Sequence, residues 1–224
     1  MATRARLIDV SHVVEHGMVT YKGLPGPVVS DHLTREASRQ LYEAGTEFHI
    51  GRIDLVANTG TYLDAPFHRF ADGLDVADIP LDAVADVPGV LIRAPHEAGL
   101  AVDAAAFSRV DVRGRAVLVH TGWDAHWRTP RYYEDHPFLT ADAAALLAAD
   151  GATLVGIDSH NIDDTRRRSR PVHTALLGAG VFIVEHLCNL AAVPERGFRF
   201  TAAPVRVRGL GTFPVRAFVS VEDL

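Results

Sequence analysis

The chain has 224 residues, of which 48% are hydrophobic and 22% charged. This balance excludes intrinsic disorder, which combines low apolar content with high charge, and the length suits a single buried core. The formal charge of -6 gives no basic excess, which argues against a nucleic-acid partner or an anionic membrane surface. Because Cys188 is the single cysteine, any metal must be held by histidine and carboxylate side chains.

The sequence also lacks the features of membrane and multidomain proteins. No run approaches the roughly 18 apolar residues that a membrane helix requires, and the first residues carry no apolar signal-peptide core. There is no internal repeat and no linker rich in proline or glycine. We therefore expect one cytoplasmic domain over residues 1–224.

Short apolar runs predict strands that outnumber the helices. In chain order, the predicted strands cover residues 5–10, 48–56, 89–93, 116–120, 153–157, 181–184, 205–207 and 215–221. Helices are predicted over residues 141–149, with Thr140 as the N-cap, and over residues 171–177. Because helices alternate with strands only in the C-terminal half, the pattern predicts an α/β domain with a curved or barrel-like mixed sheet and a few covering helices.

The segment from Asn58 to His68 carries the densest polar pattern. If it is extended, its two-residue period places Asn58, Tyr62, Asp64 and His68 on one face, and Gly60 allows close approach of a ligand or another backbone. Such a face suits a functional site. From the residue types alone, a turn whose polar side chains face water is favoured over a functional site.

Two further candidates lie more than 100 residues farther along the chain. His173 falls on the second predicted helix, and Glu185 ends an apolar strand, where a carboxylate is unusual. For Glu185 taken alone, the favoured interpretation is a surface residue at a strand end or the partner of a nearby arginine. The arginine-rich run 166–170 could grip an acidic substrate, although a solvated loop or a subunit contact is the favoured interpretation.

Together these motifs resemble the metal-dependent cyclase and hydrolase family that includes bacterial kynurenine formamidase and isatin hydrolase. The segment from Asn58 to His68 is similar to the family signature His-x-Gly-Thr-His-x-Asp-x-Pro-x-His, with Asn58 and Tyr62 in place of two histidines. Other similar pieces follow in the same order: residues 8–12, 118–123, 156–158, 185–190 and 214–217. The resemblance covers nearly the whole chain and implies a swivelling β/β/α fold assembled as a homodimer or homotetramer.

The resemblance further implies one divalent ion, zinc or manganese, held by Asp64, His173 and Glu185, with His68 as the proton-transfer residue. A second ion is not expected, because the Asn58 amide is a weak ligand and the Tyr62 phenol must lose a proton of pKa about 10 before it binds well. Tyr62 is expected instead to donate a hydrogen bond to a developing oxyanion.

The favoured function is a metal-dependent hydrolase or cyclase that acts on the acyl bond of a small cyclic or aromatic amide, lactam, lactone or ester. Two alternatives stay open: a metal-free cyclase or dehydratase that uses His68 and Tyr62 as acid and base, and a catalytically silent binding protein. The expected partners are a small-molecule substrate and other subunits, with no nucleic acid and no membrane. The expected substrate contacts are Asn58, His12, His160 and Trp123.

Overall fold

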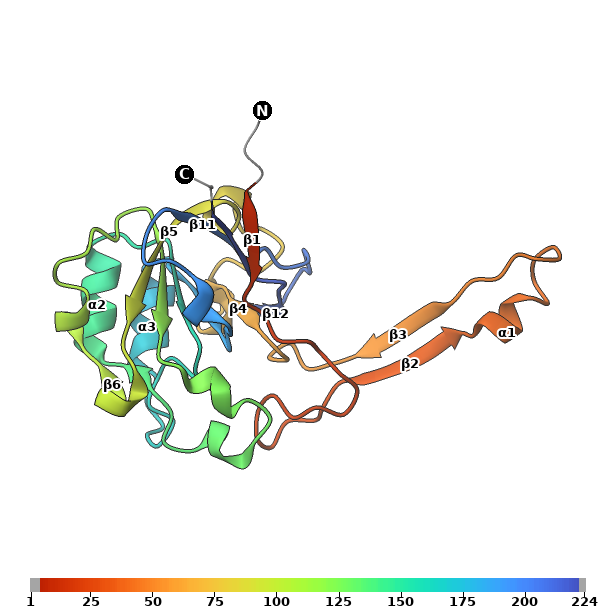
Figure 1. Cartoon of the computed structure of the whole chain (residues 1–224), viewed down its shortest axis with the longest axis horizontal. Helices are drawn as coiled ribbons and strands as arrows, with labels where there is room; N and C mark the ends of the chain where they lie inside the picture. The colour runs from red at the N-terminus through yellow and green to blue at the C-terminus, as the bar shows by residue number, and fades with distance from the viewer. Residues whose placement is uncertain (1–4, 222–224) are drawn as a thin grey trace.

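A curled sheet of nine strands forms the body of the molecule in the computed structural model, which describes residues 5–221 (Figure 1). Its strand order is β1-β13-β11-β5-β7-β9-β10-β4-β12. The central strands β5, β7, β9 and β10 are parallel, and their neighbours on both sides are antiparallel. The sheet curls into a half-barrel, which confirms the predicted α/β class.

The strands of this sheet are short, and two further strand pairs lie outside it. The large sheet contains β1 (Arg6–Asp9), β4 (Tyr62–Asp64), β5 (Val87–Arg93), β7 (Ala116–His120), β9 (Leu154–Ile157), β10 (Phe182–Glu185), β11 (Phe198–Thr201), β12 (Thr212–Pro214) and β13 (Phe218–Val221). The outlying pairs are β2 (Val28–Leu33) with β3 (Ile50–Asp54), and β6 (Ala101–Val102) with β8 (Phe138–Leu139).

Few helices accompany these strands. The α-helices are α1 (Arg35–Ser38), α2 (Ala141–Ala149) and α3 (Pro171–Gly178). Single 3-10 turns cover Pro66–His68, Leu81–Ala83, His96–Ala98, Ala104–Ala106, Trp123–His126, Pro130–Tyr133 and Leu190–Ala192. Within residues 5–221, none of the helices has the length and apolar character needed to cross a bilayer.

The parallel strands bury both of their faces. Along β7, Leu118 points into a core inside the curl of the sheet, whereas Val117 and Val119 point into a second core. Leu147 of α2 and Leu176 of α3 belong to this second core, so the two helices cover the outer face. The polar residues of β4 and β10 are therefore exceptions within an apolar interior.

Most sequence-based element predictions are confirmed. Residues 141–149 form α2, and the helix predicted over 171–177 is α3 with one additional residue. The predicted strand over 205–207 is wrong, because Val205 is 64% exposed and this segment makes no ladder. Arg206 and Arg208 hold the segment instead, through hydrogen bonds to the Ala77 carbonyl and the Asp78 carboxylate.

Residues 28–54 form an arm that projects away from the body (Figure 1). Its strands β2 and β3 pair only with each other, and α1 lies toward the far end. The facing pair Val29 and Ile53 is about half exposed, at 48% and 54%. The strand predicted over residues 48–56 is thus β3, but it belongs to this arm and not to the main sheet.

Candidate active site

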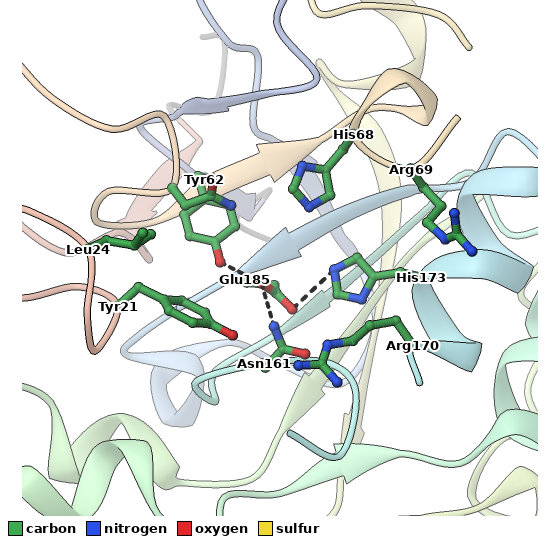
Figure 2. Close-up of a pocket in the computed structure, with 10 residues that line it drawn as sticks. Tyr21, Leu24, Tyr62, His68, Arg69, Asn161, Arg170, His173 and Glu185 are labelled. Atoms are coloured by element: carbon green, nitrogen blue, oxygen red, sulfur yellow. Dashed lines mark hydrogen bonds and ion pairs between the residues drawn. The ribbon is translucent and has the colours of Figure 1, made fainter. Parts of the chain in front are cut away.

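Side chains from distant parts of the sequence line a cavity of about 270 Å³ (Figure 2). The lining residues are Tyr21, Leu24, Asn58, Tyr62, His68, Arg69, Asn161, Arg170, His173 and Glu185. Figure 2 shows Glu185 at the centre, with Tyr21 and Leu24 on one side and the two arginines on the other. The cavity therefore combines an acidic centre, an apolar wall and two cations.

Glu185 and Tyr62 face the cavity together because their strands pair in register. Glu185 of β10 lies opposite Tyr62 of β4, and opposed residues of antiparallel strands project to the same face. The Tyr62 hydroxyl donates to Glu185 Oε2 at 2.6 Å, and the Ile162 backbone N–H donates to Oε1 at 2.7 Å. Asn161 adds a longer contact of 3.4 Å to Oε2.

The Glu185 carboxyl is almost fully buried. Burial raises the pKa of Glu185 to about 7; the positive charge of His173 opposes this increase, and the negative charge of Asp64 adds to it. The group therefore changes its protonation near neutral pH, a property that suits a residue that transfers protons.

Asp64 is fully buried at the end of β4, and only one of its oxygens has a hydrogen-bond partner. The Thr212 hydroxyl donates its single proton to Oδ1, since Thr212 lies opposite Asp64 in the β12–β4 pair. Thr212 Oγ1 is also 2.8 Å from Nδ1 of His68 and accepts a proton from it, which leaves the lone pair on His68 Nε2. Asp64 Oδ2 has no partner among the described residues.

His173 brings a second imidazole to Asp64 from helix α3. Its Nδ1 is 2.6 Å from Asp163 Oδ2, and Asp163 also accepts the backbone N–H groups of Val172 and His173 at the start of the helix. His173 Nε2 then lies 3.6 Å from Asp64 Oδ2 and 3.7 Å from Glu185 Oε1. Burial alone lowers the pKa of His173, but the hydrogen bond with Asp163 and the nearby carboxylates of Asp64 and Glu185 raise it to about 10.

These donors fit one metal ion. One ligand atom each of Asp64, His68 and His173 lies within 4.8 Å of the others, and an unpartnered carboxylate oxygen beside two imidazoles suits zinc or manganese. The Asp163 contact to the far nitrogen of His173 is the usual support for a metal-binding histidine. The predicted ligand set differs, because it has Glu185 in place of His68.

A second ion does not fit the residues present. Tyr62 uses its proton in the hydrogen bond to Glu185, and burial together with the charges of Glu185 and Asp64 raises the pKa of Tyr62 well above its usual value. The phenol therefore stays protonated and is a poor metal ligand. Asn58 lines the cavity but offers only a neutral amide.

Three of the four expected substrate contacts lie outside the cavity lining. Trp123 is fully buried, and its indole N–H donates to the Tyr132 carbonyl, so the ring has no free surface for a substrate. His12 stacks on Trp127, with ring centroids 3.8 Å apart. His160 is buried behind Tyr21, with ring centroids 4.6 Å apart. Only Asn58 reaches the cavity among the four.

The extended conformation expected from Asn58 to His68 is confined to the short strand Tyr62–Asp64. Pro66 starts a 3-10 turn that ends at His68 and directs this imidazole toward the cavity. Gly60 has the positive φ of 67° that glycine tolerates, and a Cβ at this position would lie 2.9 Å from Val14. The close approach expected at Gly60 is thus made by a side chain of the N-terminal segment.

Several residues of the site were not predicted from local sequence patterns. Thr212 and Asp64 are brought together by the β12–β4 pairing, which local patterns do not indicate. Tyr21 and Leu24 come from an irregular segment before the arm, and Arg69 directly follows His68. Asp163 follows β9 in the chain, and only the fold brings its carboxylate to the start of α3.

Comparison with known proteins agrees with this geometry. The model of the Cyclase family, described as "Putative cyclase", matches residues 8–164. The chain is 25% identical over 212 residues to kynurenine formamidase of Bacillus cereus, covering 95% of this chain and 96% of that enzyme.

Solved structures show the same architecture. A protein described as a potential metal-dependent hydrolase with cyclase activity superposes with a TM-score of 0.80 at 27% identity, covering 99% of this chain and 100% of that one. Isatin hydrolase A from Labrenzia aggregata, bound to benzyl benzoate, has a TM-score of 0.82 at 20% identity, covering 98% and 94% of the two chains. At 20% identity, the similarity to isatin hydrolase A shows a shared fold alone.

Proposed function

Because the chain belongs to the Cyclase family of hydrolases and cyclases, we propose that it is a hydrolase with one catalytic metal ion. Its proposed target is the C–N or C–O acyl bond of an amide, lactam, lactone or ester whose body is small and cyclic or aromatic. The observation that carries the proposal is the buried Asp64 Oδ2, which has no hydrogen-bond partner within the described chain and lies beside two imidazoles.

We assign the ion, zinc or manganese, to Asp64, His68 and His173. When bound, such an ion acts as a Lewis acid that polarises the acyl carbonyl. The sequence-based proposal used Glu185 as the third ligand and His68 as the proton carrier. We favour His68 as the ligand because it joins the group of donors within 4.8 Å, whereas the Glu185 carboxylate already accepts three hydrogen bonds.

Glu185 is the proton carrier in this proposal. As a carboxylate it takes a proton from the attacking water, whose oxygen forms the new bond to the acyl carbon. It then returns this proton to the nitrogen or oxygen that leaves when the acyl bond breaks. The Ile162 N–H and the Tyr62 hydroxyl hold the carboxylate in place. Once Glu185 is protonated it accepts more weakly, so the Tyr62 hydroxyl becomes free to donate to the substrate oxygen that gains charge.

A second candidate, metal-free acid and base catalysis, is supported by a different observation. His173 lies 2.6 to 3.7 Å from oxygens of Asp163, Asp64 and Glu185, so its imidazolium would supply a fixed positive charge among three carboxyl groups. His68 and Tyr62 would then act as base and acid. Asn58 and Tyr62, which replace two metal-binding histidines of the signature, favour this version.

A substrate screen with and without metal separates the two candidates. Aromatic amides, lactams, lactones and esters are offered to protein that has been dialysed against chelator, and then to the same protein reloaded with zinc or manganese. The favoured proposal expects turnover only after reloading. Full activity after exhaustive chelation would support the metal-free version, and no acyl turnover by the reloaded protein would contradict the hydrolase.

We further propose that the protein is a cytoplasmic homodimer or homotetramer in which the arm packs on a second copy of the chain. A two-stranded hairpin is marginally stable alone, and this one exposes Val29 and Ile53 along its length and Leu41, Tyr42 and Phe48 near its tip. Because most oligomers are homo-oligomers, we assign a second copy of this chain as the partner that covers the arm.

A further inference from the structure

Two arginines of the cavity are not used by the proposed reaction. Arg69 directly follows the metal-site residue His68, and Arg170 precedes His173 by three positions at the start of α3. Both line the cavity (Figure 2). Their cationic groups thus flank the acidic centre from two different elements.

Neither guanidinium is neutralised by the protein. Within residues 5–221, no carboxylate oxygen lies within 4.0 Å of Arg69 or Arg170, whereas Arg166 in the same loop pairs with Asp164 at 2.8 Å. A guanidinium in a cavity without a carboxylate partner is suited to an anionic ligand, which it can bind through two parallel hydrogen bonds.

The two arginines are also held in place. Arg170 Nη1 donates to the backbone carbonyls of Arg167 and Ser169, at 2.6 and 2.9 Å, and the guanidinium also lies beside the Tyr21 hydroxyl. Arg69 Nε donates to Thr174 Oγ1 at 3.2 Å, and the Thr174 hydroxyl donates to the Arg170 carbonyl at 2.7 Å. Thr174 therefore links the two arginine segments, and their positions are set by α3.

From these contacts we infer that Arg69 and Arg170 form a subsite for an anionic group of the substrate, at a position separate from the acyl bond. The substrate class is then a small apolar or aromatic acyl compound that also carries a carboxylate or a similar anion. Tyr21 and Leu24 line the apolar side of the cavity, where the body of such a molecule would lie. The inference rests on the proposed function for the acyl bond, but the anion subsite is testable without turnover.

The test measures binding of benzenesulfonate by calorimetry and compares it with methyl phenyl sulfone, an uncharged compound of similar shape. A sulfonate is a weak metal ligand and a good arginine partner, so its binding reports the arginines and not the ion. We expect the sulfonate to bind at least tenfold more tightly than the sulfone, in both chelated and metal-loaded protein. Equal affinity for the two compounds, or no binding of the sulfonate, would overturn the inference.

Variants locate the subsite. Arg170→Gln and Arg69→Gln are each expected to weaken sulfonate binding about tenfold and to leave sulfone binding unchanged. Arg168→Gln is the matched control, because Arg168 belongs to the same basic run but is exposed and does not line the cavity. An equal loss in Arg168→Gln would show a diffuse charge effect and would contradict a built subsite.

The two arginine variants and the substrate screen separate a failure of the subsite from a failure of the proposed hydrolase. The side chain of Arg69 is exposed, so Arg69→Gln tests the subsite even if Arg170→Gln loosens its loop, and thermal melting reports such loosening. Sulfonate binding by a protein that hydrolyses no acyl substrate would reject the hydrolase and retain the subsite. Acyl turnover without selective sulfonate binding would reject the subsite and retain the hydrolase.

Discussion

At the scale of single residues, the hydroxyl of Tyr62 determines how Glu185 is held. A histidine at this position would offer a metal ligand, whereas the phenol offers a proton to a buried carboxylate. Compared with a histidine, Tyr62 therefore exchanges a metal-binding function for a positioning function. Glu185 thereby has partners on both oxygens, and one oxygen of Asp64 has no hydrogen-bond partner among residues 5–221.

Tyr62→Phe tests this exchange. Removal of the hydroxyl leaves Glu185 with one donor fewer, so we expect turnover to fall at least tenfold and the free energy of unfolding to fall by about 1 to 2 kcal/mol. Tyr132→Phe is the control, because the Tyr132 hydroxyl contacts His186 Nδ1 at 2.9 Å and lies outside the cavity. Tyr132→Phe should lower the free energy of unfolding, measured by urea denaturation, by a similar amount and leave kcat unchanged. Equal kcat values in both variants would contradict the assigned role of Tyr62.

Thr212→Val tests the support of the metal site. The Thr212 hydroxyl contacts both Asp64 and His68, so its loss should weaken metal affinity about 10- to 100-fold, and Thr212→Ser should restore it. Competition with a fluorescent chelator measures the affinity. Thr201→Val removes a hydroxyl that only accepts the Asp86 N–H, and it should leave metal affinity unchanged. If Thr212→Val binds metal as tightly as the wild type, Thr212 does not support Asp64 and His68 as metal ligands.

At the scale of elements, strand pairing assembles the site. β4 is only three residues long, yet it pairs with β10 on one side and with β12 on the other, which brings Glu185 and Thr212 to its two polar residues. Behind the cavity, the loops after β9 and β10 carry His160 and His186 in a buried aromatic cluster. The cluster has a consequence for stability in acid.

His160 should make the protein acid-sensitive. Burial lowers the pKa of His160 to about 3, and the charges of His136 and Arg170 add to this effect. The unfolded chain takes up a proton on His160 below about pH 6.5, whereas the folded chain takes it up only near pH 3. Compared with His160→Gln, wild-type stability should therefore fall by about 1.4 kcal/mol per pH unit between about pH 6 and 4.

Urea denaturation at three pH values in this range measures that difference. A difference that stays constant with pH would show that His160 is not held neutral by burial.

Local sequence patterns identified most elements but not their contacts. Residues 116–120 were predicted as a strand because they form a short apolar run, and residues 141–149 as a helix that begins after Thr140; both predictions are confirmed. Asp64, His68, His173 and Glu185 were predicted as one site, and they do share one region. Thr212, Tyr21 and Arg69 were missed because only the strand order and the loop paths bring them close.

At the scale of the whole molecule, the arm is the feature that a single globular core does not explain. β3 was predicted as a short apolar run, and such a run has the same sequence whether a core covers it or the strand projects from the body, so the path of residues 28–54 was missed. The exposed apolar side chains of the arm have no cover within the described residues of this chain, which is why we assign them to a second subunit.

Polar substitutions on the arm test the proposed assembly of subunits. Ile53→Glu combined with Phe48→Ser should shift the mass measured by light scattering toward the 24.3 kDa monomer, because it removes the apolar contacts of the arm. Leu81→Glu is the control, since Leu81 is 69% exposed but lies on the body. A monomeric wild-type protein, or an oligomer that survives the arm variant, would contradict the proposed interface.

The metal content of the purified protein tests most directly whether one catalytic ion is bound; mass spectrometry measures it on protein that has not been exposed to a chelator or to a metal-affinity column. We predict about one zinc or manganese ion per chain, lost in Asp64→Ala and in His68→Ala, and retained in Glu185→Gln. A metal-free wild-type protein would contradict a metal-dependent hydrolase and favour acid and base chemistry through His68 and Tyr62. Two ions per chain, or loss of the ion in Glu185→Gln alone, would contradict the assigned ligands.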